Sequence, residues 1–287
     1  MRSLSLIGLF SPALVFASSE GVKQSATDLF NIGGIPISNS ILTTWIVAAL
    51  IIVGVRLAVG TPKLIPGKGQ GVVEGMAQGL RDALEPIVGK KMIGKTFPLL
   101  CGFFIFILLM NWSGLLPGVG TIKFHTEAGW QDAIRPANSD LNTTLALSVL
   151  SFVAWTYFVL RYAGFKVLVF DLFGNKADKK EVGMLMWVLL IPIFFAVGGI
   201  EVVSIAFRLI SLSFRLFGNV FGGENLIHAL SDPSTLGAFA TYVVPAMAGL
   251  LEILVGLIQA FVFTLLSAVY IGLICNHEGG HDDEHAH

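Results

Sequence analysis

Charged side chains are scarce in this chain: Asp, Glu, Lys and Arg make up only 13% of its 287 residues. Soluble domains carry charge on about a quarter of their residues, so the composition excludes an ordinary soluble protein. The formal net charge of −1 shows no basic excess, and we therefore expect no nucleic-acid partner. Hydrophobic residues reach 54% and the mean hydropathy is +0.79, which together predict a polytopic membrane protein in contact with a lipid bilayer.

Cysteine is nearly absent as well. The two cysteines, Cys101 and Cys275, both lie in apolar runs and have the character of small core residues. This scarcity excludes a disulfide framework and a cysteine-rich metal site. We expect no metal site and no cofactor in the chain.

The first residues form a short apolar stretch of their own. Arg2 precedes an apolar run over residues 4–16, and small residues follow it at positions 17–19. This arrangement is typical of a cleavable secretory signal, placed here at residues 1–18, with a short uncleaved anchor as the alternative. In both cases residues 19–40 would form an external N-terminal segment.

Five further apolar segments are long enough to cross a membrane. They cover residues 41–59, 97–116, 141–162, 184–230 and 239–274. The last two exceed one perpendicular crossing, so we expect them to tilt strongly, bend or break, with Pro192 and the pair Gly198 and Gly199 as bending points. The pattern predicts an all-α membrane domain over residues 41–275 with about five membrane segments.

Lysine and arginine counts in the connections predict the orientation. Residues 60–96 hold six of them and residues 161–183 hold five, whereas residues 117–140 hold only Lys123 and Arg135. The positive-inside rule therefore places the first two connections and the polar, His-rich tail at 276–287 in the cytoplasm, and the N-terminus outside. Within the first connection, apolar residues on one face of positions 73–84 predict an amphipathic helix on the membrane surface.

Two short motifs match enzyme signatures and are rejected on their context. Residues 89–96 satisfy the phosphate-binding P-loop pattern, but that pattern requires a preceding strand, and here an amphipathic helix precedes it. Residues 277–281, His-Glu-Gly-Gly-His, satisfy a zinc-protease pattern, which needs a helix and a water-excluding cleft. Paired glycines in a polar tail supply neither, so an intramembrane metalloprotease is the weakly supported enzyme alternative.

A polar stripe interrupts the fourth apolar segment. Its residues recur at intervals of three and four and so share one helical face: Glu201, Ser204, Arg208, Ser211, Arg215, Asn219 and Gly222. An arginine at bilayer depth costs roughly 2.5–3.5 kcal/mol on insertion scales, so we expect Arg215 to meet a charge, an ion or a water-filled path. For Arg208, a structural ion pair with Glu201 is the alternative.

The final apolar segment carries matching polar side chains. Glu252 and Gln259 lie seven residues apart on one helical face, and Glu224 follows Arg215 in the preceding segment. Carboxyl groups at membrane depth can form proton relays. Two long antiparallel helices, each with one polar face, would therefore form a hydrated seam with Arg215 near its middle.

Four blocks of sequence resemble subunit a of the F-type ATP synthase, in matching order. They are Ser-Leu-Ser-Phe-Arg-Leu-Phe-Gly-Asn at 211–219, the final-helix block at 252–266, Pro-Ala-Asn-Ser-Asp-Leu-Asn-Thr-Thr at 136–144, and residues 92–100. The resemblance runs from about residue 40 to residue 275. It departs from the family at Leu209, where a proline commonly follows the basic residue, and at Glu224 and Glu252, where some relatives have His.

The resemblance implies a stator subunit of a membrane proton channel, a non-catalytic component of the F1F0 complex in a bacterial inner membrane. Protons would reach a rotating ring of c subunits through an external half-channel lined by Asp140, Asn219, Glu224, Glu252 and Gln259. They would leave toward the cytoplasm past Glu201, Ser204 and Ser211, with Arg215 separating the two paths and Arg208 in a secondary role. The implied partners are the c-ring, the b subunits of the peripheral stalk and the rest of the complex. A secondary ion-coupled transporter is the alternative, although such folds usually carry an internal repeat and no second arginine stripe is present.

Overall fold

The computed structural model describes residue 26 and residues 28–32, 35–116, 123–126, 129–132, 135–166, 169, 184–230 and 233–275. Five helices in this part are long and apolar enough to cross a membrane, over Asn39–Val59, Lys90–Ser113, Leu141–Ala163, Pro192–Ile227 and Ala246–Leu273. The predicted all-α polytopic class is therefore confirmed. The signal-like segment and the His-rich tail lie outside the described residues.

The helices follow one another as α1 (Asn39–Val59), α2 (Lys68–Val88), α3 (Lys90–Ser113), α4 (Leu141–Phe158), α7 (Met184–Leu230) and α8 (Pro233–Cys275). A 3-10 turn, η2 (Ala137–Ser139), precedes α4, and a π-helical turn, η3 (Val159–Ala163), prolongs it. Two antiparallel hairpins complete the described part, β1 (Asp28–Ile32) with β2 (Ile35–Ser38), and β4 (Lys123–Thr126) with β5 (Gly129–Asp132).

Local signals explain where several helices begin and end. The Ser38 hydroxyl accepts the Ile41 N–H at 3.4 Å and starts α1, and the Asp140 carboxylate accepts the Asn142 N–H at 3.2 Å and starts α4. Gly89, with φ of 88°, lies between α2 and α3 and allows the chain to turn where other residues would be strained. The residues that match the P-loop pattern therefore follow a helix and enter α3, and the strand that the pattern requires is not there.

The core of the described residues lies along α3 and α8. At one end, Leu84 of α2, Leu100 of α3 and Ile271 of α8 pack in a buried cluster. Gly272 allows this close packing, because a Cβ there would overlap the Ile87 carbonyl oxygen of α2. The predicted amphipathic helix is thus present as α2, and the structure adds that its C-terminal apolar face packs on α3 and α8.

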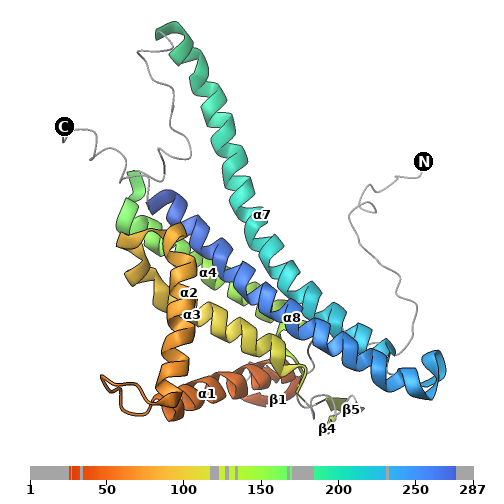
Figure 1. The fold of residues 1–287 in the computed structure, drawn as a ribbon. Coiled ribbons are helices and arrows are strands. Elements are labelled where there is room, and N and C mark those ends of the chain that lie inside the picture. Colours follow the sequence, from red (N-terminus) through yellow and green to blue (C-terminus); the bar gives the residue numbers. More distant parts are fainter. Residues whose placement is uncertain are drawn as a thin grey trace, which may run out of the picture.

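The two longest helices, α7 and α8, run antiparallel and side by side, and they part toward the N-terminal end of α7 (Figure 1). A second buried cluster joins them to α3, with Leu212 and Leu216 of α7, Phe263 of α8 and Ile107 of α3. α7 is one helix from Met184 to Leu230, with Pro192 inside it, so of the expected tilt, bend or break the break does not occur. The long polar seam predicted from the sequence therefore lies on two continuous helices.

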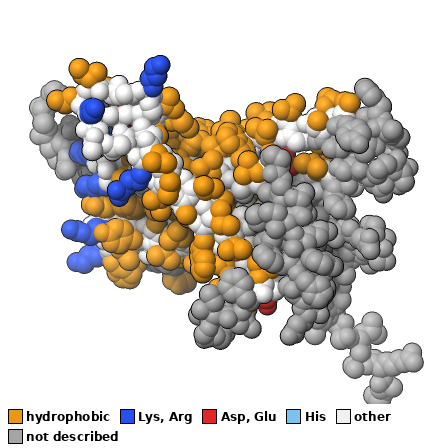
Figure 2. Space-filling view, turned by 90° about the horizontal axis from the view of Figure 1, so that it is seen from below, with side chains coloured by type: hydrophobic (Ala, Val, Ile, Leu, Met, Phe, Trp, Pro, Cys, Tyr) orange, Lys and Arg blue, Asp and Glu red, His pale blue; other side chains and the backbone are white. Residues whose placement is uncertain are grey.

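Basic side chains gather at one end of the molecule. Figure 2 shows Lys and Arg at the end where, in Figure 1, α2 and the start of α3 lie, with apolar side chains over much of the remaining described face. Lys90, Lys91 and Lys95 of α3 and Arg161 of η3 are exposed there. This distribution is what a membrane protein with one basic, cytoplasmic end requires, and the orientation itself stays a prediction.

Candidate functional site

Arg215 lies on an exposed face of α7 and lines an open pocket of about 250 Å³. The pocket is formed by α7 and α8, and besides Arg215 its polar lining consists of Ser204, Arg208, Ser211 and Tyr270. Three side chains of the predicted stripe are therefore brought together on one side of Arg215. Among the residues that the structure describes, no carboxylate lies within ion-pair distance of the Arg215 guanidinium.

Arg208 is held by two contacts at the edge of this pocket. Its Nη2 lies 3.9 Å from Glu201 Oε1, and its guanidinium lies 4.5 Å from the centre of the Tyr270 ring. The structural pair that the sequence left open is thus present. Because the two charged side chains are 35% and 46% exposed, the pair contributes little to stability, and its main effect is to fix the position of Arg208.

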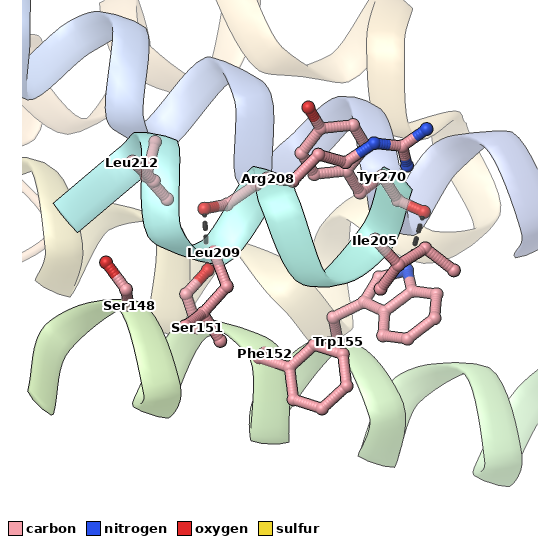
Figure 3. Close-up of a pocket in the computed structure, with 10 residues that line it drawn as sticks. Ser148, Ser151, Phe152, Trp155, Ile205, Arg208, Leu209, Leu212 and Tyr270 are labelled. Atoms are coloured by element: carbon pink, nitrogen blue, oxygen red, sulfur yellow. Dashed lines mark hydrogen bonds between the residues drawn. The ribbon is translucent and has the colours of Figure 1, made fainter. Parts of the chain in front are cut away.

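Side chains of α4 form hydrogen bonds to α7 and α8 beside this pocket. Ser151 and Ser267 share a hydrogen bond of 2.9 Å, and the Trp155 indole N–H donates to the Tyr270 carbonyl oxygen at 3.0 Å (Figure 3). Thr144 and Ser213 share a further hydrogen bond of 3.1 Å. These contacts hold Tyr270 of α8 in place. The Tyr270 ring in turn positions the Arg208 side chain, which lies beside it (Figure 3).

On the other side of Arg215, α7 and α8 are joined by an amide pair. Asn219 Nδ2 donates to Gln259 Oε1 at 2.9 Å, and Gln259 is only 3% exposed. Gln259 Nε2 is buried, and among the described residues it has no hydrogen-bond partner.

Two carboxyl groups lie farther along the same seam. The Glu252 carboxyl of α8 lies against Gly223 of α7, where a Cβ would come within 2.7 Å of it. Glu224 Oε2 lies 3.7 Å from Nε of Arg135, a residue just ahead of η2. The Glu252 carboxyl group therefore lies against the residue that directly precedes Glu224. The two carboxyl groups have different surroundings, a glycine backbone for Glu252 and an arginine for Glu224.

α3 holds the α8 backbone between Glu252 and Gln259. The Trp112 indole N–H donates to the Ile253 carbonyl oxygen at 3.1 Å, and Asn111 Nδ2 donates to the Gly256 carbonyl oxygen at 3.1 Å. Asn138 of η2 in turn donates to Asn111 Oδ1 at 2.8 Å. This network fixes the turns of α8 between Glu252 and Gln259, so both side chains project from a rigid backbone.

Sequence comparisons identify the family of the chain. Residues 41–272 match the family described as ATP synthase A chain. The chain belongs to this ATP synthase subunit family.

Relatives from distant bacteria support the membership. The chain is 31% identical over 245 residues to ATP synthase subunit a of Moorella thermoacetica, covering 85% of this chain and 94% of the relative. It is also 31% identical over 234 residues to ATP synthase subunit a of Desulfotalea psychrophila, covering 82% and 83%. The match to ATP synthase subunit a 2 of a Bradyrhizobium species is again 31% identical, over 248 residues, covering 86% and 93%.

Membership of the subunit a family confirms the predicted resemblance. It makes the chain a multi-pass membrane component of the F1F0 ATP synthase complex and connects it with ATP synthesis and proton transport. The individual roles assigned to the site residues stay predictions. The structure brings Ser204, Ser211 and Arg215 into one pocket, and it joins Asn219 to Gln259.

The remaining predicted residues are placed less directly. Glu201 reaches the pocket through its contact with Arg208. Asp140 is buried and caps α4, and the turn before it, η2, packs against α7. Asp140, which only the family resemblance implied as a channel residue, therefore has a described hydrogen bond that is that of a helix cap.

Several site residues were missed by the sequence reasoning. Sequence patterns mark Arg135 only as one of two basic residues in a connection, and they give Asn111 no role in the site. One signal was available for Arg135, because it directly precedes the block at 136–144 that resembles the subunit a family. No local pattern links Asn111 to Gly256 across 145 positions.

Proposed function

We propose that this chain is the stator subunit through which protons reach and leave a rotating ring of c subunits, in two aqueous half-channels separated by Arg215. The order of polar groups along the seam of α7 and α8 is the observation that carries the proposal. A pocket lined by Ser204, Ser211 and Arg215 lies to one side, and the Asn219–Gln259 pair and the two carboxyl groups lie to the other. Neither set continues past the guanidinium.

Arg215 is exposed on the surface of the chain, which supports the presence of a partner subunit whose carboxylate pairs with it. Phe207, Ile210 and Phe214 are exposed on α7, as are Leu254, Ile258 and Phe261 on α8, so both helices expose large apolar side chains in addition to the polar stripe. An arginine facing lipid alone would be costly, and no carboxylate of the described residues pairs with it. A mid-membrane carboxyl group on each subunit of the ring would supply the missing charge.

Arg215 would act by its permanent charge. A guanidinium next to a ring carboxyl group favours the ionised form, so each arriving site releases its proton there. The same charge repels a proton that would otherwise pass directly between the half-channels. Each proton that crosses releases about 2.3 kcal/mol per 100 mV of membrane potential, and rotation of the ring would gather this energy over several protons.

The proposal also sets the surroundings of the chain. The b subunits of the peripheral stalk would hold it against the ring, with the remainder of the F1F0 complex completing the assembly in a bacterial inner membrane. The basic end with Lys90, Lys91 and Arg161 would face the cytoplasm. The N-terminus would then lie outside, and the half-channel with Glu224 and Glu252 would open to the external side.

Proton movement in inverted membrane vesicles tests the role of Arg215. For Arg215→Ala we expect ATP-driven acidification to be lost, while passive proton flow after removal of the soluble sector is retained or increased. Arg56→Ala is the matched control, because Arg56 is an exposed arginine in the last turn of α1 and lies outside the seam. Pumping by Arg215→Ala at the rate of the control would refute the proposed function.

A further inference from the structure

The two carboxyl groups of the external half-channel have different neighbours. Glu224 faces a cation, since its Oε2 lies 3.7 Å from Arg135 Nε. Glu252 instead lies against the backbone of Gly223. A guanidinium next to a carboxylate stabilises its negative charge, whereas a glycine backbone offers no such compensation. The two groups are therefore not equivalent.

Arg135 is held in place by the fold and is not a loop charge. It is 5% exposed, and its backbone N–H donates to the Thr43 hydroxyl of α1 at 3.3 Å. Its guanidinium Nη2 lies 3.5 Å from the Ser139 carbonyl oxygen of η2. The next residue, Pro136, packs so closely on Gly114 that a Cβ at that glycine would lie 2.6 Å from the proline ring. Three separate parts of the chain therefore fix the arginine opposite Glu224.

We propose that Arg135 is a positioning residue of the external half-channel: it holds Glu224 as a fixed carboxylate and leaves Glu252 as the carboxyl group that exchanges protons. This inference rests on the proposed function. Glu252 receives a proton from external water and passes it toward the Asn219–Gln259 pair and the ring carboxylate, returning to its ionised form. Glu224 contributes a constant negative charge that attracts protons to the access path without binding them at each step.

A double-substitution series in the assembled complex tests the pairing. For Arg135→Gln we expect ATP-driven proton pumping to fall about tenfold or more, because the partly buried Glu224 carboxylate, 24% exposed, then lacks its cation. Arg135→Lys keeps the positive charge and should retain most of the activity. Arg135→Gln combined with Glu224→Gln should recover several-fold over Arg135→Gln alone, since both members of the pair are then neutral.

The second arm of the series uses the other carboxyl group. Glu252→Gln removes the proposed proton-exchanging group. The double variant Arg135→Gln with Glu252→Gln should therefore pump no better than Glu252→Gln alone. If Arg135→Gln alone does not assemble, the two double variants decide: only the one with Glu224→Gln should assemble and pump. Equal rescue of both, or rescue of neither, would overturn the inference.

A matched ion pair on the surface provides the control. Arg81 Nε and Glu85 Oε2 of α2 are also 3.7 Å apart, but their side chains are 46% and 31% exposed, against 6% and 24% for Arg135 and Glu224. Neutralising either or both should leave pumping unchanged, because water screens an exposed pair. If Arg215→Ala abolishes pumping but the Arg135 series shows no rescue, the inference fails while the proposed function stands.

Discussion

Gly223 sets the distance between the Glu252 carboxyl group and α7, so a single methyl group at this position should impair proton transport. A Cβ built at Gly223 lies 2.7 Å from Glu252 Cδ, 2.7 Å from Oε1 and 3.1 Å from Oε2. Ordinary contacts of a Cβ begin at 3.4 Å, so the carboxyl group must retreat by at least 3.4 − 2.7 = 0.7 Å. The group that moves is the far end of a flexible side chain, and the helices themselves need not separate.

The expected result is a functional defect without an assembly defect. Alanine is favoured over glycine inside a helix by about 1 kcal/mol, so Gly223→Ala should not weaken α7 itself. A displacement approaching 1 Å can reduce a rate by about a hundredfold when the moved group must meet its partner in a defined geometry. We expect ATP-driven acidification of inverted vesicles to fall about tenfold, with normal amounts of the chain in the purified complex.

Gly222→Ala is the control for this experiment. It adds the same methyl group one residue earlier, where nothing lies within 4 Å of the built Cβ. Pumping by this variant should match the unaltered complex. If Gly223→Ala pumps as well as Gly222→Ala, then the position of the Glu252 carboxyl group does not limit transport and the reasoning from this contact is wrong.

Two further predictions address the guanidinium and the core. Arg215→Lys should lose coupled pumping in vesicles although it keeps a basic residue, because a buried lysine can release its proton while arginine stays charged; normal coupling would argue against a permanent charge at this site. Leu84→Ala removes a fully buried side chain between α2, α3 and α8, and should destabilise the fold by about 2–5 kcal/mol, seen as a lower melting temperature of the detergent-extracted complex. The exposed Met76 on the same helix is its control, and an equal shift for Met76→Ala would contradict the assigned core.

Periodicity and hydropathy were sufficient for the parts of the fold that depend on local sequence. The five crossing helices follow from apolar runs long enough to span a bilayer, and the polar stripe of α7 follows from residues three and four positions apart. The ends were less accurate, since α3 begins at Lys90 instead of 97 and α8 at Pro233 instead of 239. For α8 the reason is the proline at its start. Proline is tolerated in the first turn of a helix because its missing N–H would have no partner there, so the helix can begin before the apolar run does.

Contacts between distant segments could not be predicted from the same patterns. Arg135 and Glu224 meet across 89 positions, and Asn138 donates to Asn111 across 27, with no repeat in the sequence to connect them. The amphipathic pattern of α2 identified its apolar face but not the surface that covers it. Leu84 of α2 can be buried against α3 and α8 because Gly272 of α8 lets α2 approach closely. The role of this glycine is visible only once α2 and α8 are placed together.

The polar contacts of α3 explain why the site can depend on sub-ångström positions within a membrane. Lipid gives no hydrophobic drive for helix association, so side chains that bond across helices must align them. Trp112 and Asn111 donate to two α8 carbonyl groups one turn apart, just after Glu252 and before Gln259. The Asn219–Gln259 pair then fixes α7 against this anchored stretch. The packed α3 and α8 therefore form the rigid reference, and the exposed face of α7 that carries Arg215 is held in a constant position relative to Glu252.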